Sequence, residues 1–235
     1  MCGLKVWWKV LALLVGVFLA GCTPPATPRS TPQLPAAATP SPTLQRLLPS
    51  PRAEGPLSLE EALSKRRSVR TYADRPLTTE EVGQLLWAAQ GINRPEGYRT
   101  APSAGALYPL EMYLVDAEGV WHYHPQGHEL ALWREGDHRP RLCPAALEQE
   151  AVCRAPAVFV ITAVFARTAG KYGERAPRYV WLEAGHAAQN LLLQAVALNL
   201  GAVPIGAFYD DQVQAALELP PDHEPLYLIP VGEPR

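Results

Sequence analysis

The sequence lacks the signatures of several common protein classes. Its net charge is only −2 over 235 residues, so no excess of basic residues points to nucleic acid as a partner. Its first apolar run, from Val10 to Ala20, is shorter than the roughly 20 residues that span a bilayer. No G-x-G-x-x-G follows a strand and no Walker loop is present, which excludes the usual Rossmann and P-loop nucleotide sites.

Potential metal ligands are also few. Cys143 and Cys153 do not have the spacing of a metal site, and the sequence does not decide whether they pair as a disulfide. His122 and His124 are two apart on an expected strand and point the same way. No carboxylate is well placed to complete a site with them or with His128, so we expect no metal.

The first 21 residues have the pattern of a bacterial export signal. Lys5 and Lys9 precede the short apolar run, and small residues follow it. The exit LAGC, residues 19–22, resembles the bacterial lipobox, in which the cysteine becomes the lipidated first residue of the mature protein. We therefore expect residues 1–21 to be a signal peptide and Cys22 to anchor an extracytoplasmic lipoprotein to the membrane.

A proline-rich segment follows the expected anchor. Ten of the 34 residues from Thr23 to Pro56 are proline, which lacks an amide donor and fixes φ. We expect residues 22–56 to form a semi-extended tether. The remaining 179 residues, 57–235, suit a single domain with a sizeable core.

Periodicity within this domain predicts both helices and strands. Helices are expected over 59–66, from 79 to Gly91, over 178–200 and over 210–219; strands are expected over 111–116, 119–125, 128–135, 157–165 and 225–232. The helix over 178–200 is apolar nearly all round, so it belongs in a core or in a core shared with a second subunit. This order of elements indicates the α+β class.

Two stretches of polar residues could carry chemistry. Arg66, Arg67, Ser68 and Arg70 end the first helix. They either complement the helix dipole or bind a phosphate through guanidinium and hydroxyl donors. Lys171 and Tyr172 are expected in a loop before the long helix; spacing alone favours an exposed loop, although the pair could act as acid and base.

The long helix carries polar groups of its own. Glu183 and His186 are three residues apart and so share a face. Most such groups on an apolar helix are satisfied by core or interface hydrogen bonds rather than used in catalysis.

Two turns are rich in small residues. They are APSAGALYP, residues 101–109, and LGAVPIGAF, residues 200–208. Small residues let the backbone approach a partner closely. Two such turns and a basic cluster together suit a flat, phosphorylated cofactor.

Five segments in this order resemble the nitroreductase-like flavoproteins, and within them the SagB-type dehydrogenases, relatives of the azoline oxidases. The segments are RRSVRTY, APSAGALYP, KYGERAPRYVWLEAGHAAQNLLLQA, LGAVPIGAF and LYLIPVGEP. The resemblance runs, in order, over essentially all of residues 57–235. The resemblance implies an α+β fold with a central mixed sheet, flanking helices and a long buried helix. It also implies a homodimer with FMN at the subunit interface.

The resemblance further implies roles for individual residues. Lys171 and Tyr172 match the acid–base pair of azoline oxidases, whose substrates are peptides. The residues expected to bind FMN are Arg66, Arg67, Ser68, Arg70 and Arg235 around the phosphate and ribityl chain, and Pro102, Ser103, Ala104, Gly105, Pro204, Ile205 and Gly206 around the ring.

The sequence departs from the wider family at two turn positions. Ala106 stands where many nitroreductases have Asn, and Gly206 where many have Glu. Both departures fit the SagB-like branch and put simple nitroreductase activity in doubt. The expected activity is hydride transfer between FMN and a small-molecule or peptide substrate. The alternatives are a nitro- or quinone reductase, a non-catalytic flavin-binding lipoprotein, and an interaction module without flavin.

Overall fold

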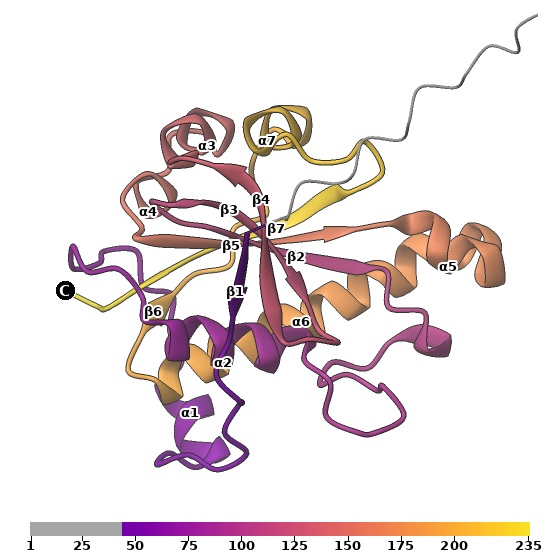
Figure 1. Cartoon of the computed structure of the whole chain (residues 1–235), viewed down its shortest axis with the longest axis horizontal. Coiled ribbons are helices and arrows are strands. Elements are labelled where there is room, and N and C mark those ends of the chain that lie inside the picture. Colours follow the sequence, from indigo (N-terminus) through magenta and orange to yellow (C-terminus); the bar gives the residue numbers. More distant parts are fainter. Residues whose placement is uncertain (1–43) are drawn as a thin grey trace, which may run out of the picture. The chain divides into compact units, whose positions relative to one another are not determined.

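The computed structural model describes residues 44–235 (Figure 1). The expected signal peptide, Cys22 and most of the tether lie outside these residues. The strands are β1 (Gln45–Leu47), β2 (Leu110–Val115), β3 (Gly119–His124), β4 (Glu129–Glu135), β5 (Ala157–Ala163), β6 (Gly201–Ala202) and β7 (Glu224–Gly232). The helices are α1 (Leu59–Lys65), α2 (Thr79–Gln90), α3 (Arg139–Ala145), α4 (Glu150–Cys153), α5 (Phe165–Tyr172), α6 (Ala176–Ala197) and α7 (Asp210–Leu217), with short 3-10 turns η1 (Ala104–Ala106) and η2 (Gly173–Arg175).

The strands form one sheet in the order β1-β4-β3-β2-β5-β7-β6. Every ladder between these strands is antiparallel. The expectation of a mixed sheet is therefore corrected, since the parallel pairing found is an isolated bridge between Ser68 and Ala202. β5 lies between β2 and β7 with every residue buried, which explains its continuous apolar run.

Helices cover both faces of the sheet (Figure 1). α1, α2 and α6 lie on one face, and α3, α4 and α7 lie on the other. Side chains of β2 point alternately to the two faces of the sheet. Leu110 and Met112 pack in the core under α2 and α6, while Tyr113 and Val115 pack in the core on the other face. The expected α+β class and the long helix are confirmed.

Local capping explains where α2 begins. Thr78 accepts a hydrogen bond from the Glu81 amide, and the Glu81 carboxylate accepts from the Thr78 amide, which completes the predicted capping box. In α1 Ser58 accepts from the Glu61 amide, while the Glu61 carboxylate pairs with Lys65 at 2.5 Å. Within residues 44–235, no helix is both long and apolar enough to cross a membrane.

Part of the expected tether packs on the domain. β1 pairs with β4 at the sheet edge, and Leu48 is buried in the first core. The Arg46 guanidinium lies 4.0 Å from the centre of the Trp121 ring and donates to Asp116 at 3.2 Å. The folded region therefore begins before residue 57.

Three helices were not expected from the sequence. α3 and α4 follow the hairpin, and a disulfide between Cys143 and Cys153 joins them. α5 takes up the end of the expected strand over 157–165 and the expected loop, so Lys171 and Tyr172 lie in its last turn. Gly173, with φ +54°, ends this helix, as glycine commonly does.

Candidate functional site

The first small-residue turn, residues 101–109, lies against the end of α5. Gly105 has φ +63°, in the left-handed region that favours glycine. A β-carbon added to Gly105 would lie 2.9 Å from Lys171 Nζ and 3.0 Å from the Tyr172 hydroxyl oxygen. The structure therefore brings together two groups of predicted site residues, and a side chain at position 105 would displace the Lys171 amine.

Lys171 and Tyr172 also contact each other and their surroundings. Lys171 Nζ lies 5.5 Å from the centre of the Tyr172 ring. That ring packs edge-on against Tyr179 of α6 with centres 4.8 Å apart. Lys171 is exposed and Tyr172 is half-buried, so both can reach a ligand on the surface of the first turn.

Arg167 and Glu111 fix the position of α5. Arg167 of α5 donates to the Tyr108 carbonyl at 3.1 Å and forms an ion pair with Glu111 of β2. His122 of β3 bonds the other oxygen of the same carboxylate at 2.7 Å. Burial alone would raise the pKa of Glu111, but the hydrogen bonds and charges of His122 and Arg167 lower it to about 2. His122 is therefore a hydrogen-bond partner of the Glu111 carboxylate.

The basic stretch, residues 66–70, lies beside β6, which is part of the second small-residue turn. Ser68 bridges to Ala202, and the Val69 amide donates to the Ala202 carbonyl at 3.0 Å. A β-carbon on Gly201 would lie 2.5 Å from the Val69 side chain. These contacts join the basic stretch to β6 at residues 201–202.

The arginines of the basic stretch line two cavities. Arg66 and Arg67 line one of about 500 Å³ at the C-terminal end of α6, together with Leu192 and Val196. Arg70 lines another, of about 660 Å³. Within residues 44–235, the guanidinium groups of Arg66, Arg67 and Arg70 have no hydrogen bond or ion pair to another side chain.

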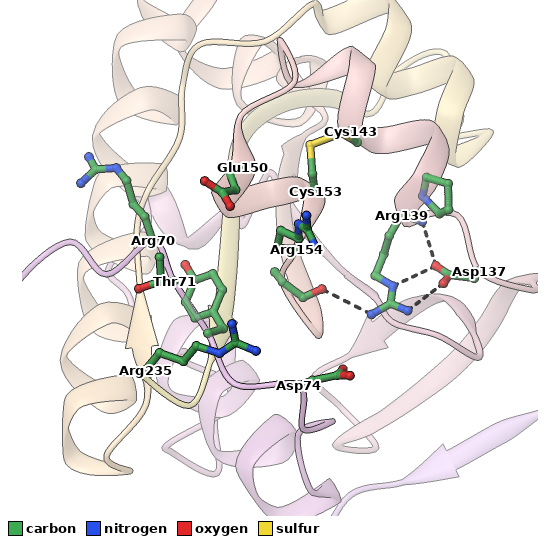
Figure 2. A pocket seen from close by; sticks show the side chains of 13 residues that line it. Arg70, Thr71, Asp74, Asp137, Arg139, Cys143, Glu150, Cys153, Arg154 and Arg235 are labelled. Carbon is green, nitrogen blue, oxygen red and sulfur yellow. Dashed lines mark hydrogen bonds and ion pairs between the residues drawn. A yellow bond between two sulfur atoms is a disulfide. The ribbon is translucent and has the colours of Figure 1, made fainter.

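Figure 2 shows the larger cavity. Arg70 and Arg235 lie on one side of it, with the Cys143–Cys153 disulfide in its wall. The Arg139 guanidinium on the far side is neutralised by Asp137 at 2.7 Å. The other guanidinium groups that line this cavity are those of Arg70, Arg154 and Arg235.

The second turn is only partly available to a ligand. Ile205 is buried and exchanges two backbone hydrogen bonds with Leu228, at 2.8 and 3.0 Å. Its side chain belongs to the second core, so it offers little to a site. Pro204 is half-buried and Gly206 is exposed, and a β-carbon on Gly206 would meet only Tyr227, at 3.9 Å.

The first turn and the basic stretch lie at opposite ends of α6. Tyr172, whose hydroxyl lies at Gly105, packs against Tyr179 near the start of α6, whereas Arg66 and Arg67 share a cavity with Leu192. The separation of 13 residues from Tyr179 to Leu192 corresponds to about 20 Å along a helix. Within one copy of the chain, the two groups of predicted ligand-binding residues therefore lie far apart.

Several residues of the site region were not singled out from the sequence. They are Gln90, Arg99, Tyr108, Glu111 and Arg167, which lie behind the first turn or fix α5. Their signal was weak, because Glu111 reads as the first residue of an expected strand and the others as polar residues of loops or helix ends. The sequence also left open whether Cys143 and Cys153 pair, and the structure shows the disulfide between them.

An antiparallel sheet covered on both faces, with a glycine turn against a Lys–Tyr pair and a separate basic stretch, defines an α+β protein. The sequence profile of the Nitroreductase family matches residues 63–233. This chain belongs to the nitroreductase family of oxidoreductases.

Individual relatives agree with this assignment. A nitroreductase-family protein of Methanocaldococcus jannaschii is 43% identical over 183 residues, covering 75% of this chain and 91% of the relative. The crystal structure of a nitroreductase-family protein of Ralstonia eutropha matches with a TM-score of 0.75 and 30% identity, covering 81% of this chain and 90% of that one.

Two more distant structures share the fold. The McbBCD microcin synthetase complex of E. coli, solved with truncated pro-MccB17, matches with a TM-score of 0.63 and 21% identity, covering 80% of this chain and 76% of that one. The NADPH:FMN oxidoreductase of Vibrio harveyi matches with a TM-score of 0.56 and 23% identity, covering 75% and 68%.

Proposed function

We propose that this chain is an FMN-dependent oxidoreductase of the SagB type, with Lys171 and Tyr172 as its acid–base pair. The observation that carries the proposal is the contact of Gly105 with both of these side chains. When bound, the flavin supplies the hydride acceptor or donor. The chain's own residues bind and orient the ligands and move protons.

The two side chains lie at the same turn. Lys171 Nζ and the Tyr172 hydroxyl both approach the Gly105 backbone, each about 3 Å from where a β-carbon would be. A substrate bound against the turn lies near both groups, which can donate and accept protons.

The basic stretch fits the phosphate of FMN. The guanidinium groups of Arg66, Arg67 and Arg70 are free of other side chains within the described residues, and Arg235 lines the same cavity as Arg70 (Figure 2). Guanidinium groups bind phosphate oxygens well, and the exposed Ser68 hydroxyl adds a donor. Gly105 and Gly206 are exposed and carry no side chain, which leaves room for a flat ring.

A complete site requires a second copy of the chain. The first turn and the basic stretch lie about 20 Å apart along α6, which supports a site that combines the turn of one subunit with the arginines of the other. Trp181 and Leu182 of α6 are 60% and 52% exposed, and burial against a partner would cover them. We propose a homodimer with two such sites.

The proposed location is outside the cytoplasmic membrane, anchored through Cys22. The Cys143–Cys153 disulfide supports this location, because such bonds persist in oxidising compartments. The substrate is then a small molecule or a peptide met outside the cytoplasm. The peptide-bound synthetase complex with the same fold supports keeping peptides as a substrate class.

An absorption spectrum tests the cofactor. The purified chain is measured before and after incubation with FMN and gel filtration. The proposal predicts flavin bands that remain with the protein and are lost in an Arg66→Ala/Arg70→Ala variant, while Arg94→Ala, far from the basic stretch in sequence, retains them. A chain that takes up no FMN contradicts the proposal and leaves an interaction module.

A nitro- or quinone reductase is the second candidate, favoured by the family match over residues 63–233. Reduction of menadione by NADPH with the FMN-loaded protein distinguishes it. Rapid turnover that survives Lys171→Ala favours the reductase. Bound flavin that no donor or acceptor turns over favours a non-catalytic flavin-binding protein.

A further inference from the structure

Tyr108 of the first turn holds an unfavourable backbone conformation. Its φ is +47°, in the left-handed region, where a bulky residue is an outlier. Pro109 follows it, and a residue before proline normally keeps to extended conformations. Such strain persists only where surrounding contacts hold it, and it is common at functional sites. The chemistry proposed above gives Tyr108 no role, so its conformation needs another explanation.

The backbone of Tyr108 is held from two sides. Its amide donates to the Ser103 hydroxyl oxygen at 2.9 Å, and its carbonyl accepts from the Arg167 guanidinium at 3.1 Å. The next carbonyl, that of Pro109, accepts from the Val164 amide, just before α5, at 2.8 Å. The first bond closes the turn on itself, and the other two join it to the helix that carries the acid–base pair.

The side chain of Tyr108 is anchored as well. Its hydroxyl oxygen accepts from the Arg99 amide at 3.2 Å, and the Arg99 guanidinium lies 4.6 Å from the centre of its ring. This guanidinium also donates to Gln90 Oε1 at 2.7 Å, and Gln90 is buried at the end of α2. Tyr108 therefore joins the first turn to α2 as well as to α5.

The reach of these contacts argues against a purely local role for Tyr108. Its partners Arg99 and Arg167 lie 9 and 59 residues away in the sequence. Gly105 and Ala106 at the tip of the turn are exposed and have little or no side chain. Packing of their own side chains cannot hold the tip in place, whereas the contacts of Tyr108 can.

We propose that Tyr108 is a positioning residue, which locks the first turn to α5 so that Gly105 stays against the acid–base pair. The left-handed backbone is the strained state that its four contacts maintain. The consequence for ligand binding and proton transfer rests on the proposed function. The mechanical coupling of the turn to α5 does not.

Hydrogen exchange on the full chain, without cofactor, tests this coupling in both directions. Tyr108→Gly keeps the left-handed backbone accessible but removes the side-chain anchor to Arg99. The Gly173 amide, which donates to the Ala169 carbonyl at the end of α5, should then exchange several-fold faster. In Arg167→Met, the amide of Tyr108 should exchange several-fold faster.

Two variants serve as matched controls. Tyr98→Gly changes a tyrosine that is 47% exposed, and Arg178→Met changes an exposed arginine of α6. Both should exchange as the wild type does, and the amides of the buried strand β5 should be unchanged in every variant. Wild-type exchange at Gly173 in Tyr108→Gly, or at Tyr108 in Arg167→Met, overturns the proposal. An equal acceleration in β5 also overturns it, because the effect is then a general loss of stability.

FMN affinity provides the functional readout. A loosened turn must be ordered when a ligand binds, so Tyr108→Gly should bind FMN about tenfold more weakly than the wild type. Tyr108→Phe keeps the ring beside the Arg99 guanidinium and should restore most of this loss. Wild-type affinity in Tyr108→Gly, or no rescue in Tyr108→Phe, overturns the positioning role. A wild type that binds no FMN overturns the proposed function instead, and hydrogen exchange still decides the role of Tyr108.

Discussion

Lys171 Nζ lies 2.9 Å from the position that a β-carbon on Gly105 would occupy. Gly105→Ala combines backbone strain at φ +63° with displacement of Lys171 and Tyr172. We expect a loss of about 1 kcal/mol in stability and a fall in turnover of at least tenfold. Urea unfolding and activity measurements check this.

Gly97→Ala is the matched control, because Gly97 has φ +86° and nothing within 4 Å of its added β-carbon. It should lose similar stability and keep its activity. Equal activity losses in the two variants would show that strain, rather than the contact with Lys171, is responsible.

Removal of the Lys171 amine should separate chemistry from cofactor binding. General acid–base groups contribute about 10²–10⁴-fold to rate, so Lys171→Ala should lower turnover by at least about 100-fold and leave FMN bound. Flavin absorbance and steady-state rates measure the two effects. Arg94→Ala, the control already used for FMN uptake, serves as the control here too, and full turnover in Lys171→Ala would remove the assigned role.

The shared carboxylate of Glu111 predicts an acid-dependent loss of stability. Its pKa is lowered to about 2 in the folded chain, despite burial, by His122 and Arg167, and it returns to its ordinary value near 4.5 on unfolding. A depressed folded pKa stabilises the fold above pH 4.5, and this contribution is lost as pH falls towards 2.

Glu111→Gln tests that dependence by urea unfolding between pH 2 and 7. The variant should be less stable than the wild type at pH 7 and show a flatter decline below pH 4.5. Parallel curves for the two proteins would mean that Glu111 does not carry the effect.

The Cys143–Cys153 disulfide closes a short loop of sequence separation 10. In the chain-entropy description, its removal costs about 2–3 kcal/mol. Cys143→Ala/Cys153→Ala should therefore unfold at lower urea concentration than the wild type, and reductant should lower the wild type to the same midpoint. A wild type unaffected by reductant under unfolding conditions would show that the cysteines do not pair.

Much of the fold could be predicted from the sequence. Continuous or periodic apolar patterns identified β5, α6 and the β3–β4 hairpin, because each buries a face whose spacing is visible in the chain. α5 was missed because Gly170 and Gly173 bracket the Lys–Tyr pair and read as a loop. β1 was missed because it is only three residues long and lies in a proline-rich segment.

The site was less accessible to sequence reasoning than the fold. Motif spacing named Gly105, Lys171 and Tyr172 separately, but their contact depends on α5 folding back over the first turn. Glu183 was read as a satisfied core residue, whereas its Oε1 is orphaned. Such features depend on side-chain geometry between elements distant in sequence.

The central claim is that two copies of the chain build one flavin site. Mixing the Arg66→Ala/Arg70→Ala variant with a Gly105→Val variant, under conditions that exchange subunits, tests it most directly. Neither variant alone should bind FMN. Random re-pairing makes half of the dimers mixed, each with one intact site, so uptake should recover to about a quarter of the wild-type level. No recovery in demonstrably mixed dimers would contradict a shared site.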